Sequence, residues 1–434
     1  MKKISGGQKP YFDPALIGES EGREVTVQAC VHRVRKMSGF AFIILRTGRY
    51  LLQALWNPDC KNGIDGLRDG CYGEFCGLVR AQPKAPLGHE IVLSGWKALS
   101  GASEEFPLKI SQRSLGCSLD ANLDHRSVAL RNPKERAVFH VSQAVESAFR
   151  DFMIENKFTE IHSPKIVMAG AEGGATLFGL EYFDRPAYLS QSPQFYKQTG
   201  VALFERVFEI GPVFRAEKHN TSRHLNEYIG LDFEMGYIDS MYDIMETETG
   251  FINRMLENVA RDCAYELDML CAEIPKPGTI PAVTFVEAMD ILKETRPKAD
   301  LDPDDELKLC KYSQENFGSE FIFVSHFPSA KRPFYTMDDP ENPKLALSFD
   351  LLFRGLEITT GSQRIHGYQE QIQKCARYNI KPEELGAYLE AHKYGIPPHG
   401  GAGIGHERLV MKLLNLPNVR QASLFPRDVN RLDP

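Results

Sequence analysis

The stretch FRAEKHNTSRHLNEYIGLDFEM, residues 214–235, decides the fold. It starts at the end of one β-like run, passes through a polar loop and continues into a second run, YIGLDFEM, which is the pattern of a long-looped hairpin. Arg215 and Glu217 stand on the first arm, and Asp232 and Glu234 on the second, so we expect charges of both signs over one sheet face. For any single charge, a solvated ion pair is the simplest explanation.

Two further blocks carry residues suited to chemistry. GGAGIGHERLVMKLL (400–414) is a Gly-rich junction between a strand and a helix, where glycines let the backbone approach a ligand and Arg408 lies on the helix. EITTGSQR (357–364) is a β-like run with an acid, hydroxyls and a terminal arginine. A Gly-rich turn alone is weak evidence, because such turns are common.

The main part of the chain has the pattern of a mixed α+β domain. Apolar residues recur at helical spacing over 134–156, and the following strand, FTEIHSPKIV, is interrupted by Pro164. Further β-like runs alternate with a long helical block at 240–269. We therefore expect an antiparallel sheet flanked by helices, with a surface insertion at about 240–330.

The N-terminal part contains five short β-like runs separated by Gly-containing turns. These are EVTVQACVHRV (24–34), FAFIILR (40–46), YLLQALW (50–56), CYGEFCGLVRA (71–81) and HEIVLSGWK (89–97). Five such strands with few helix signals predict a small five-stranded β-barrel, with an OB-fold as the leading candidate. We therefore divide the chain into an N-terminal extension and barrel (1–105), a linker (106–133) and the α+β domain (134–434).

The charge is unevenly distributed along the chain. The formal net charge is −7, yet residues 22–100 contain eleven Lys and Arg against six Asp and Glu. A basic module on an acidic body fits a polyanionic partner held at one end, although a short segment can also acquire such a bias by chance.

Composition excludes several classes of protein. Hydrophobic residues make up 42% and charged residues 25% of the 434 positions, as in ordinary globular proteins. No window approaches the length of a membrane span, and the N-terminus lacks the apolar segment of a secretory signal. The nine cysteines include no CxxC pair, so we expect reduced thiols and no zinc site. With the absence of a membrane-spanning window, these thiols predict a cytoplasmic protein without membrane association.

Taken together, residues 214–235, 357–364 and 400–414 resemble motifs 2 and 3 of class II aminoacyl-tRNA synthetases. The helix at 134–156 and the strand after it resemble motif 1, whose proline, here Pro164, lies at the interface of a homodimer. The barrel points to subclass IIb, and QSPQFYKQ (191–198) narrows the resemblance to the compact archaeal and eukaryotic type of aspartyl-tRNA synthetase.

This resemblance implies a reaction in which L-aspartate attacks the α-phosphate of ATP, and the adenylate then passes to the 3′-terminal ribose of tRNA. Positioning and charge neutralisation dominate such chemistry. The resemblance assigns Arg215 to the α-phosphate and the attacking carboxylate, and Arg408 to the adenine and the γ-phosphate. Glu357, with Asp350, is the implied Mg²⁺ ligand. The other ATP-site residues implied are Glu217, Arg223, His224, Leu225, Tyr228, Gly405, His406 and Glu407.

The implied choice of amino acid depends on charge pairing. A side-chain carboxylate calls for a cation, and the resemblance supplies Arg364 with Lys197 as its second partner. Asparagine would leave both cations unpaired in a closed site. The remaining residues implied at the aspartate are Glu172, Gln194, Arg215, Asp232 and Thr360.

The barrel is expected to read the anticodon, because splayed bases stack on aromatic rings and expose their edges. Phe42 matches a stacking position and Gln53 the position that reads the central U. Enzymes restricted to the aspartate tRNA tend to have Trp at the position of His32 and Lys at that of Pro86. The His and Pro found here resemble non-discriminating enzymes, which aspartylate both tRNA(Asp) and tRNA(Asn).

The resemblance therefore implies a homodimeric, ATP- and Mg²⁺-dependent aspartate–tRNA ligase. Three alternatives stay open: an asparaginyl-tRNA synthetase, a paralogue that activates an amino acid without tRNA, and an RNA-binding regulator with an inactive synthetase body. Retention of Arg215, Glu357 and Arg408 argues against the last of these, and the basic barrel argues against the second.

Overall fold

The N-terminal barrel forms because its strands alternate apolar and polar side chains around a closed circuit. A computed structural model describes residues 12–168 and 177–433, and its contacts divide the chain into two units, Met1–Ala137 and Val138–Pro434. The barrel closes in the order β1-β2-β3-β5-β4 around an apolar core that includes Val27, Ile43 and Phe75. Closure leaves no open sheet edge. The strands are β1 (Glu24–Lys36), β2 (Ala41–Thr47), β3 (Tyr50–Trp56), β4 (Tyr72–Ala81) and β5 (His89–Ser100).

The predicted five-stranded barrel is thus confirmed, and β1 departs from strict alternation of buried and exposed side chains. Strict alternation places His32 opposite the core-facing Val31, whereas both side chains are buried. A register shift between Val31 and Arg33 in the pairing of β1 with β2 is the physical cause, since a bulge turns the following side chain to the other face.

The segment expected to be a linker is partly helical. It contains α1 (Leu119–Asp124) and α2 (Arg126–Ala129), and a small apolar cluster includes Leu108, Ile110 and Ala129. Asn132 secures this segment, because its side-chain amide donates to the backbone oxygens of Ile110 and Gln112 at 2.9 and 2.8 Å. The segment belongs to the same unit as the barrel.

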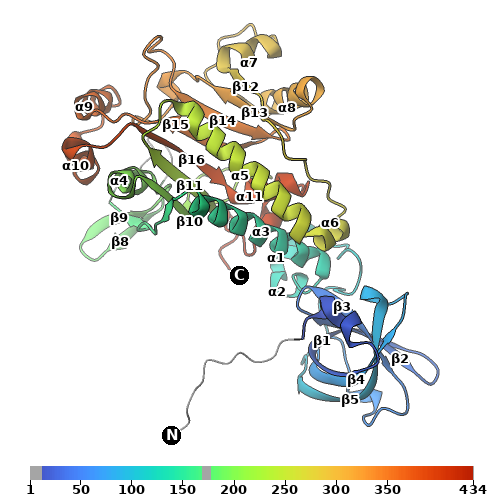
Figure 1. The fold of residues 1–434 in the computed structure, drawn as a ribbon. Coiled ribbons are helices and arrows are strands. Elements are labelled where there is room, and N and C mark those ends of the chain that lie inside the picture. The colour runs from blue at the N-terminus through green and yellow to red at the C-terminus, as the bar shows by residue number, and fades with distance from the viewer. Residues whose placement is uncertain (1–11, 169–176, 434) are drawn as a thin grey trace. The chain divides into compact units, whose positions relative to one another are not determined.

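The second unit is built on a mainly antiparallel eight-stranded sheet, ordered β12-β13-β14-β15-β16-β11-β10-β6, which confirms the predicted α+β fold (Figure 1). The pairs β12–β13 and β10–β6 at the two ends are parallel. The strands are β6 (Thr159–Glu160), β10 (Arg206–Phe214), β11 (Glu227–Gly236), β12 (Ala282–Thr284), β13 (Phe321–Ser325), β14 (Ser348–Phe353), β15 (Glu357–Gln363) and β16 (His399–Gly405).

Three helices cover one face of this sheet and leave the other available for ligands. Helices α3 (Pro133–Glu155), α5 (Met241–Asp262) and α11 (His406–Leu413) lie across the sheet in Figure 1. Their apolar faces share one core with the strands, in which Phe149, Phe251 and Phe233 are fully buried. Segment 240–330 was expected to be a surface insertion, but it begins with α5, which is part of this core.

The remaining elements surround the sheet. Helices α7 (Phe285–Leu292) and α8 (Pro303–Phe317) pack beside β13 around their own apolar cluster. The strand expected across Pro164 is split, because β6 joins the large sheet while β7 joins a small one ordered β7-β9-β8. The other elements are β7 (Ile166–Val167), β8 (Gly179–Tyr182), β9 (Arg185–Leu189), α4 (Gln194–Phe204), α6 (Ala264–Leu270), α9 (Tyr368–Arg377) and α10 (Gly386–Tyr394).

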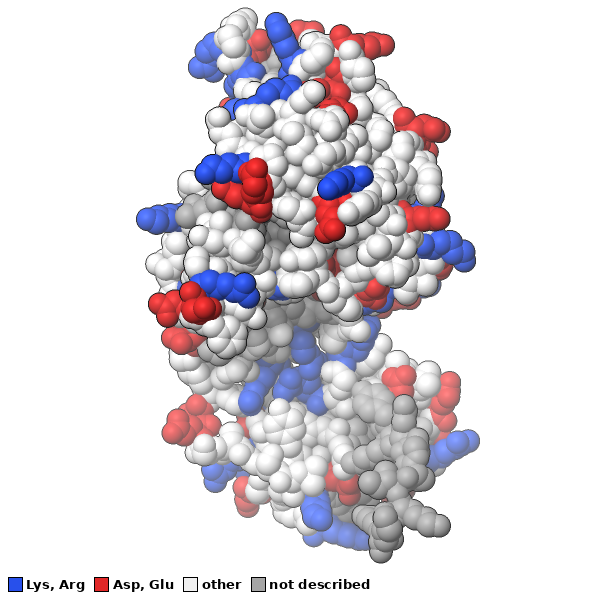
Figure 2. Space-filling model, turned by 90° about the vertical axis from the view of Figure 1, so that its left-hand side faces the viewer, with Lys and Arg blue, Asp and Glu red and all other residues white. Residues whose placement is uncertain are grey.

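On the face that Figure 2 shows, acidic and basic side chains are interspersed over the upper part of the picture, and several Lys and Arg side chains gather near its centre. Among the described residues, no helix combines the length and the apolar character that a membrane crossing needs.

Candidate active site

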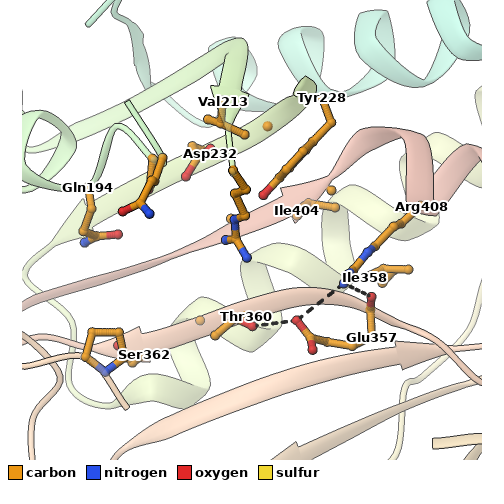
Figure 3. A pocket seen from close by; sticks show the side chains of 18 of the residues that line it. Gln194, Val213, Tyr228, Asp232, Glu357, Ile358, Thr360, Ser362, Ile404 and Arg408 are labelled. Carbon is orange, nitrogen blue, oxygen red and sulfur yellow. Dashed lines mark hydrogen bonds and ion pairs between the residues drawn. The ribbon is translucent and has the colours of Figure 1, made fainter. Parts of the chain in front are cut away.

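A pocket opens on the face of the large sheet that α3, α5 and α11 do not cover. Its floor comes from β11, β15 and β16, and α4, the loop between β10 and β11 and the loop before β14 contribute to its walls. Figure 3 shows that Gln194 and Ser362 lie toward one end, while Tyr228, Arg408 and Glu357 lie toward the other. The pocket therefore has two chemically distinct ends.

Glycines in β16 make room for buried carboxylates in this floor. Gly401 pairs with Glu234, and Gly403 pairs with Asp232. A Cβ at Gly401 would overlap the Glu234 carboxylate, and one at Gly403 would lie 3.0 Å from Asp232 Oδ1. The Gly-rich run is therefore required by the neighbouring acids as well as by any ligand.

Two buried cations and two buried acids form the first end. Lys197 Nζ donates to Asp232 Oδ1 at 3.0 Å and lies 3.5 Å from Glu234 Oε2. Arg364 donates through Nε and Nη2 to the two Glu234 oxygens at 2.8 and 3.3 Å. Each of these four side chains is at most 8% exposed. Burial opposes ionisation of Glu234, but Arg364 and Lys197 outweigh it and hold its pKa below the usual range.

Arg364 forms further hydrogen bonds besides those to Glu234. Its Nη2 also donates to the Gly401 carbonyl at 2.9 Å and to Gln194 Oε1 at 3.4 Å, and its Nη1 donates to the Ser362 hydroxyl. Thr360 lines the pocket farther along the same strand. The structure thus brings together Gln194, Lys197, Asp232, Thr360 and Arg364, while the predicted Glu172 lies outside the described residues.

The second end is built from the hairpin loop, β15 and the start of α11. Arg408 Nη1 donates to the Glu357 carbonyl at 3.1 Å and lies 3.9 Å from the Glu357 carboxylate (Figure 3). Thr360 Oγ1 donates to the same carboxylate at 3.0 Å. Arg215 lies with Cζ 5.8 Å from the centroid of the Tyr228 ring. This arrangement presents two arginines and an aromatic face to one ligand.

The hairpin loop is fixed at both of its ends. Asn226 Nδ2 donates to the backbone oxygens of Arg215 and Glu217 at 2.7 and 2.9 Å. Arg223 donates to Glu306 of α8 at 3.1 Å, so the segment expected to be an insertion supplies a contact to the loop. Burial raises the pKa of Glu306 to about 7, with Arg223 opposing that shift and Glu357 adding to it. Glu217, Arg223, His224 and Leu225 all line the pocket.

Two predicted nucleotide residues at the start of α11 are occupied by structural contacts. His406 is not among the pocket-lining residues; its Nε2 lies 2.7 Å from Ser142 Oγ on α3, and burial lowers its pKa to about 4. Glu407 borders the pocket, but its carboxylate accepts from the backbone N–H of Ile229 at 3.0 and 3.2 Å. The side chain of His406 therefore faces the protein body rather than a ligand.

The two predicted metal ligands differ in availability. The Glu357 carboxylate faces the pocket and is 38% exposed, whereas both oxygens of the buried Asp350 accept from Arg332 at 3.0 and 2.7 Å. Within residues 12–168 and 177–433, no three His, Cys, Asp or Glu side chains are grouped closely enough to cage a metal ion. One open carboxylate fits Mg²⁺, which usually takes one or two carboxylates plus substrate phosphates and water.

Sequence reasoning missed four residues of this site: Gln191, Glu234 as an ion-pair partner, Glu306 and Arg332. The Gln191 amide is buried at the pocket, and neither of its polar atoms has a hydrogen-bond partner among the described residues. Leaving such groups unpaired is costly, so a ligand contact there is expected. The QSPQ motif was the feature of the sequence that could have indicated Gln191. No local pattern marks Glu306 or Arg332, because their partners, Arg223 and Asp350, are distant in the sequence.

The four barrel residues predicted to act on the anticodon differ in how far they are exposed. Phe42 is half-buried and meets Phe40 edge-on at 5.4 Å. Gln53 Nε2 donates to the buried Glu90 at 2.7 Å, which orients its amide oxygen as an acceptor. Burial, with Arg46, Arg136 and Arg33, lowers the pKa of His32 to about 4, so this imidazole is neutral and inaccessible to a base. Pro86 begins a short 3₁₀ turn before β5.

Comparisons with known proteins agree with this geometry. Residues 118–429 match the family model of class II tRNA synthetases (D, K and N). The chain is 43% identical to the aspartate–tRNA(Asp/Asn) ligase of Deinococcus radiodurans, over 96% of this chain and 97% of that one. It is 37% identical to the aspartate–tRNA(Asp) ligase of Pyrococcus furiosus, over 98% of this chain and 100% of that one. The asparaginyl-tRNA synthetase of Pyrococcus horikoshii, solved with asparaginyl-adenylate, superposes with a TM-score of 0.88 at 30% identity, over 96% of this chain and 97% of that one. This chain belongs to the class II tRNA synthetases of the D, K and N family.

Proposed function

We propose that this chain is an aspartate–tRNA ligase, which activates L-aspartate with Mg²⁺-ATP and aspartylates both tRNA(Asp) and tRNA(Asn). The observation that carries the choice of amino acid is the pair of buried cations, Lys197 and Arg364, at one end of the pocket. A substrate carboxylate offers acceptors to their N–H groups, whereas the amide nitrogen of asparagine would set donors against donors.

The chemistry follows from the positions of the charges. Arg215 neutralises the α-phosphate and holds the attacking α-carboxylate, and Arg408 stabilises the departing pyrophosphate. Tyr228 supplies a face for the adenine. Asp232 and Gln194 are placed to accept from the substrate ammonium. Mg²⁺, when bound, would neutralise phosphate charge, and Glu357 is the residue that would hold it, whereas both oxygens of Asp350 already accept from Arg332.

The barrel is proposed to select the tRNA. The two anticodons share the central U and differ at the third base. The Gln53 amide oxygen suits the N3–H of the central uracil, because its amide nitrogen is already bonded to Glu90. His32 acts on selectivity indirectly, since it is 4% exposed and supports β1 from inside. Relatives named for both tRNAs reach 43% identity, and relatives named for tRNA(Asp) alone are 37% identical, which supports the relaxed selectivity that the charging assay tests.

We also propose a cytoplasmic homodimer, in which the exposed surface around Pro164 takes part in the interface. Sedimentation of the purified chain tests this assembly. A monomer at micromolar concentration would contradict it.

The decisive experiment is aspartate charging of purified tRNA(Asp) and tRNA(Asn) transcripts, run side by side. Comparable charging of both supports the full proposal, and charging of tRNA(Asp) alone keeps the ligase but removes the relaxed selectivity. Pyrophosphate exchange driven by asparagine instead of aspartate would establish the asparaginyl enzyme. The double variant His32→Trp/Pro86→Lys should reduce tRNA(Asn) charging more than tRNA(Asp) charging. Gln53→Ala serves as the matched control and should lower both equally.

A further inference from the structure

The loop between β10 and β11 carries residues of the nucleotide end but has little apolar support of its own. Residues 218–222 are all exposed, and Arg223 and His224, which follow them, line the pocket. The Thr221 hydroxyl contacts both, because it accepts from the backbone N–H of Arg223 at 3.3 Å and lies 2.6 Å from His224 Nδ1. The position of Thr221 therefore governs how these two residues are presented to the pocket.

The C-terminal segment 418–428 contacts this loop through a buried arginine. The side chain of Arg420 is 7% exposed. Its Nη1 donates to the Thr221 carbonyl at 2.9 Å, and its Nη2 donates to Asn220 Oδ1 at 2.7 Å. Hydrogen bonds from a charged donor are stronger than those between neutral groups. Arg420 thus makes two strong contacts to a part of the loop that no apolar packing holds.

Arg420 is itself fixed within the C-terminal segment. Its Nε donates to Asp428, whose side chain is 5% exposed, and its Nη1 also donates to Asn418 Oδ1 at 3.3 Å. Burial opposes ionisation of Asp428, but the hydrogen bond from Arg420 outweighs it and holds the pKa of that carboxyl below its usual range. The pair therefore stays charged, and its position does not depend on a ligand.

Two backbone hydrogen bonds extend the same attachment. The Val419 N–H donates to the Ser222 carbonyl at 2.8 Å, and the Asn226 N–H donates to the Arg427 carbonyl at 2.9 Å. Val419 also lines the pocket, whereas Arg420 does not. Arg420 can therefore act on a ligand only through the loop that it holds.

We propose that Arg420 is a positioning residue for nucleotide binding. It holds Thr221 from the side away from the pocket, so that Arg223 and His224 are in place before ATP arrives. A loop that adopts its binding conformation only part of the time binds its ligand with an affinity reduced by that fraction. This inference rests on the proposed binding of ATP, and it gives the C-terminal segment a part in that binding.

The first test is Arg420→Lys in the full-length chain. A lysine keeps a positive charge beside the buried Asp428, but it lacks the planar fork that reaches the acid and the loop together. The Kd for Mg²⁺-ATP, measured by isothermal titration calorimetry, should rise about tenfold, because charge-assisted hydrogen bonds to the loop are lost. The KM for aspartate should be unchanged. Arg354→Lys is the matched control, since Arg354 is forked on Glu320 outside the pocket lining, and it should leave the ATP Kd unchanged.

The second test uses an exposed partner of the arginine, so that folding is not at risk. Asn220→Ala removes only the contact to Arg420 Nη2 and should raise the ATP Kd about threefold. In the double variant Asn220→Ala/Arg420→Lys the two effects should not add, because the shared hydrogen bond can be lost only once. If Arg420→Lys does not fold, Asn220→Ala decides alone, and an unchanged ATP Kd in that variant overturns the inference.

A measurement without nucleotide separates positioning from general stability. In Arg420→Lys, hydrogen exchange over residues 218–225 should become about tenfold faster while β11 keeps its protection. An unchanged ATP Kd in a folded Arg420→Lys, an equal loss of protection in β11, or additive effects in the double variant would overturn the inference. Failure of the proposed function looks different: the wild type would then bind Mg²⁺-ATP and respond to these variants, but show no aspartate-dependent pyrophosphate exchange.

Discussion

Replacement of Arg364 by lysine isolates the hydrogen-bond fork that we assign to the aspartate side chain. A guanidinium has five N–H groups, and here Nε and Nη2 donate to Glu234, Nη2 also donates to Gly401, and Nη1 donates to Ser362. One Nη1 hydrogen is left for a ligand carboxylate. The three donors of a lysine would be absorbed by Glu234 and Gly401 alone, so the contact to the substrate is lost while the positive charge stays.

The magnitude follows from the worth of one charge-assisted hydrogen bond, about 1.5–3 kcal/mol, which is roughly a 10- to 150-fold loss in kcat/KM for aspartate. Alanine at this position is a poorer test. It would leave the fully buried Glu234 with Lys197 at 3.5 Å as its partner, and breaking a buried pair in this way costs about 3–5 kcal/mol of folding stability.

Aspartate-dependent ATP–pyrophosphate exchange is the assay, with the KM for ATP and the melting temperature measured on the same preparation. Arg354→Lys is the matched control, because Arg354 is also forked on a glutamate, Glu320, and lies outside the pocket lining. We expect the KM for ATP to be unchanged in Arg364→Lys. An aspartate kcat/KM within threefold of the wild type in a folded Arg364→Lys would refute the assignment of this arginine to the substrate carboxylate.

Three more outcomes follow from the contacts of individual residues. Burial raises the pKa of the Glu248 carboxyl to about 8, against an ordinary value of 4.5, so the folded state holds this proton more tightly than the unfolded state. The protonated carboxyl therefore contributes its full stabilisation below pH 4.5, and this contribution is lost as the pH rises through 8. Glu248→Gln should therefore stabilise the fold by about 4 kcal/mol at pH 8 and by no more than about 1 kcal/mol at pH 5, measured as shifts in melting temperature. An equal shift at both pH values would contradict the assignment. Glu306→Gln removes the partner that holds Arg223 before ATP binds, so the KM for ATP should fall severalfold, whereas Arg223→Ala should raise it. Phe42→Ala should weaken tRNA binding by roughly 1–3 kcal/mol, measured by filter binding, with aspartate-dependent pyrophosphate exchange intact; impaired exchange would point to a folding defect instead.

Local patterns predicted much of the fold. The five barrel strands follow the period-two alternation to within about three residues, because Gly-containing turns mark their ends. The expected helix at 134–156 corresponds to α3, since its apolar spacing continues over the whole length of the element. Helices α1 and α2 were missed because elements of six and four residues contain too few turns to show a helical period.

The site was predictable only where its residues share a local motif. The hairpin and the two later blocks supplied Arg215, Asp232, Arg364 and Arg408, and the sheet brings all of them to one pocket. Long-range pairs could not be found in this way. Nothing near Glu306 in the sequence indicates that it meets Arg223, 83 positions away, and the pairing of Arg332 with Asp350 depends on how a loop returns over β14.

The buried charges at the amino-acid end explain how a net-neutral site can still favour an acidic substrate. Lys197 and Arg364 balance Asp232 and Glu234, so net charge alone gives no preference between aspartate and asparagine. The preference for aspartate comes instead from hydrogen bonding, because every N–H group of Lys197 and Arg364 is a donor and neither side chain has an acceptor. An asparagine amide that turns its nitrogen toward those donors loses a contact, because its own N–H groups are donors as well. A carboxylate accepts from both, and the fixed acids keep the two cations in place before it arrives, so little reorganisation is needed when aspartate binds.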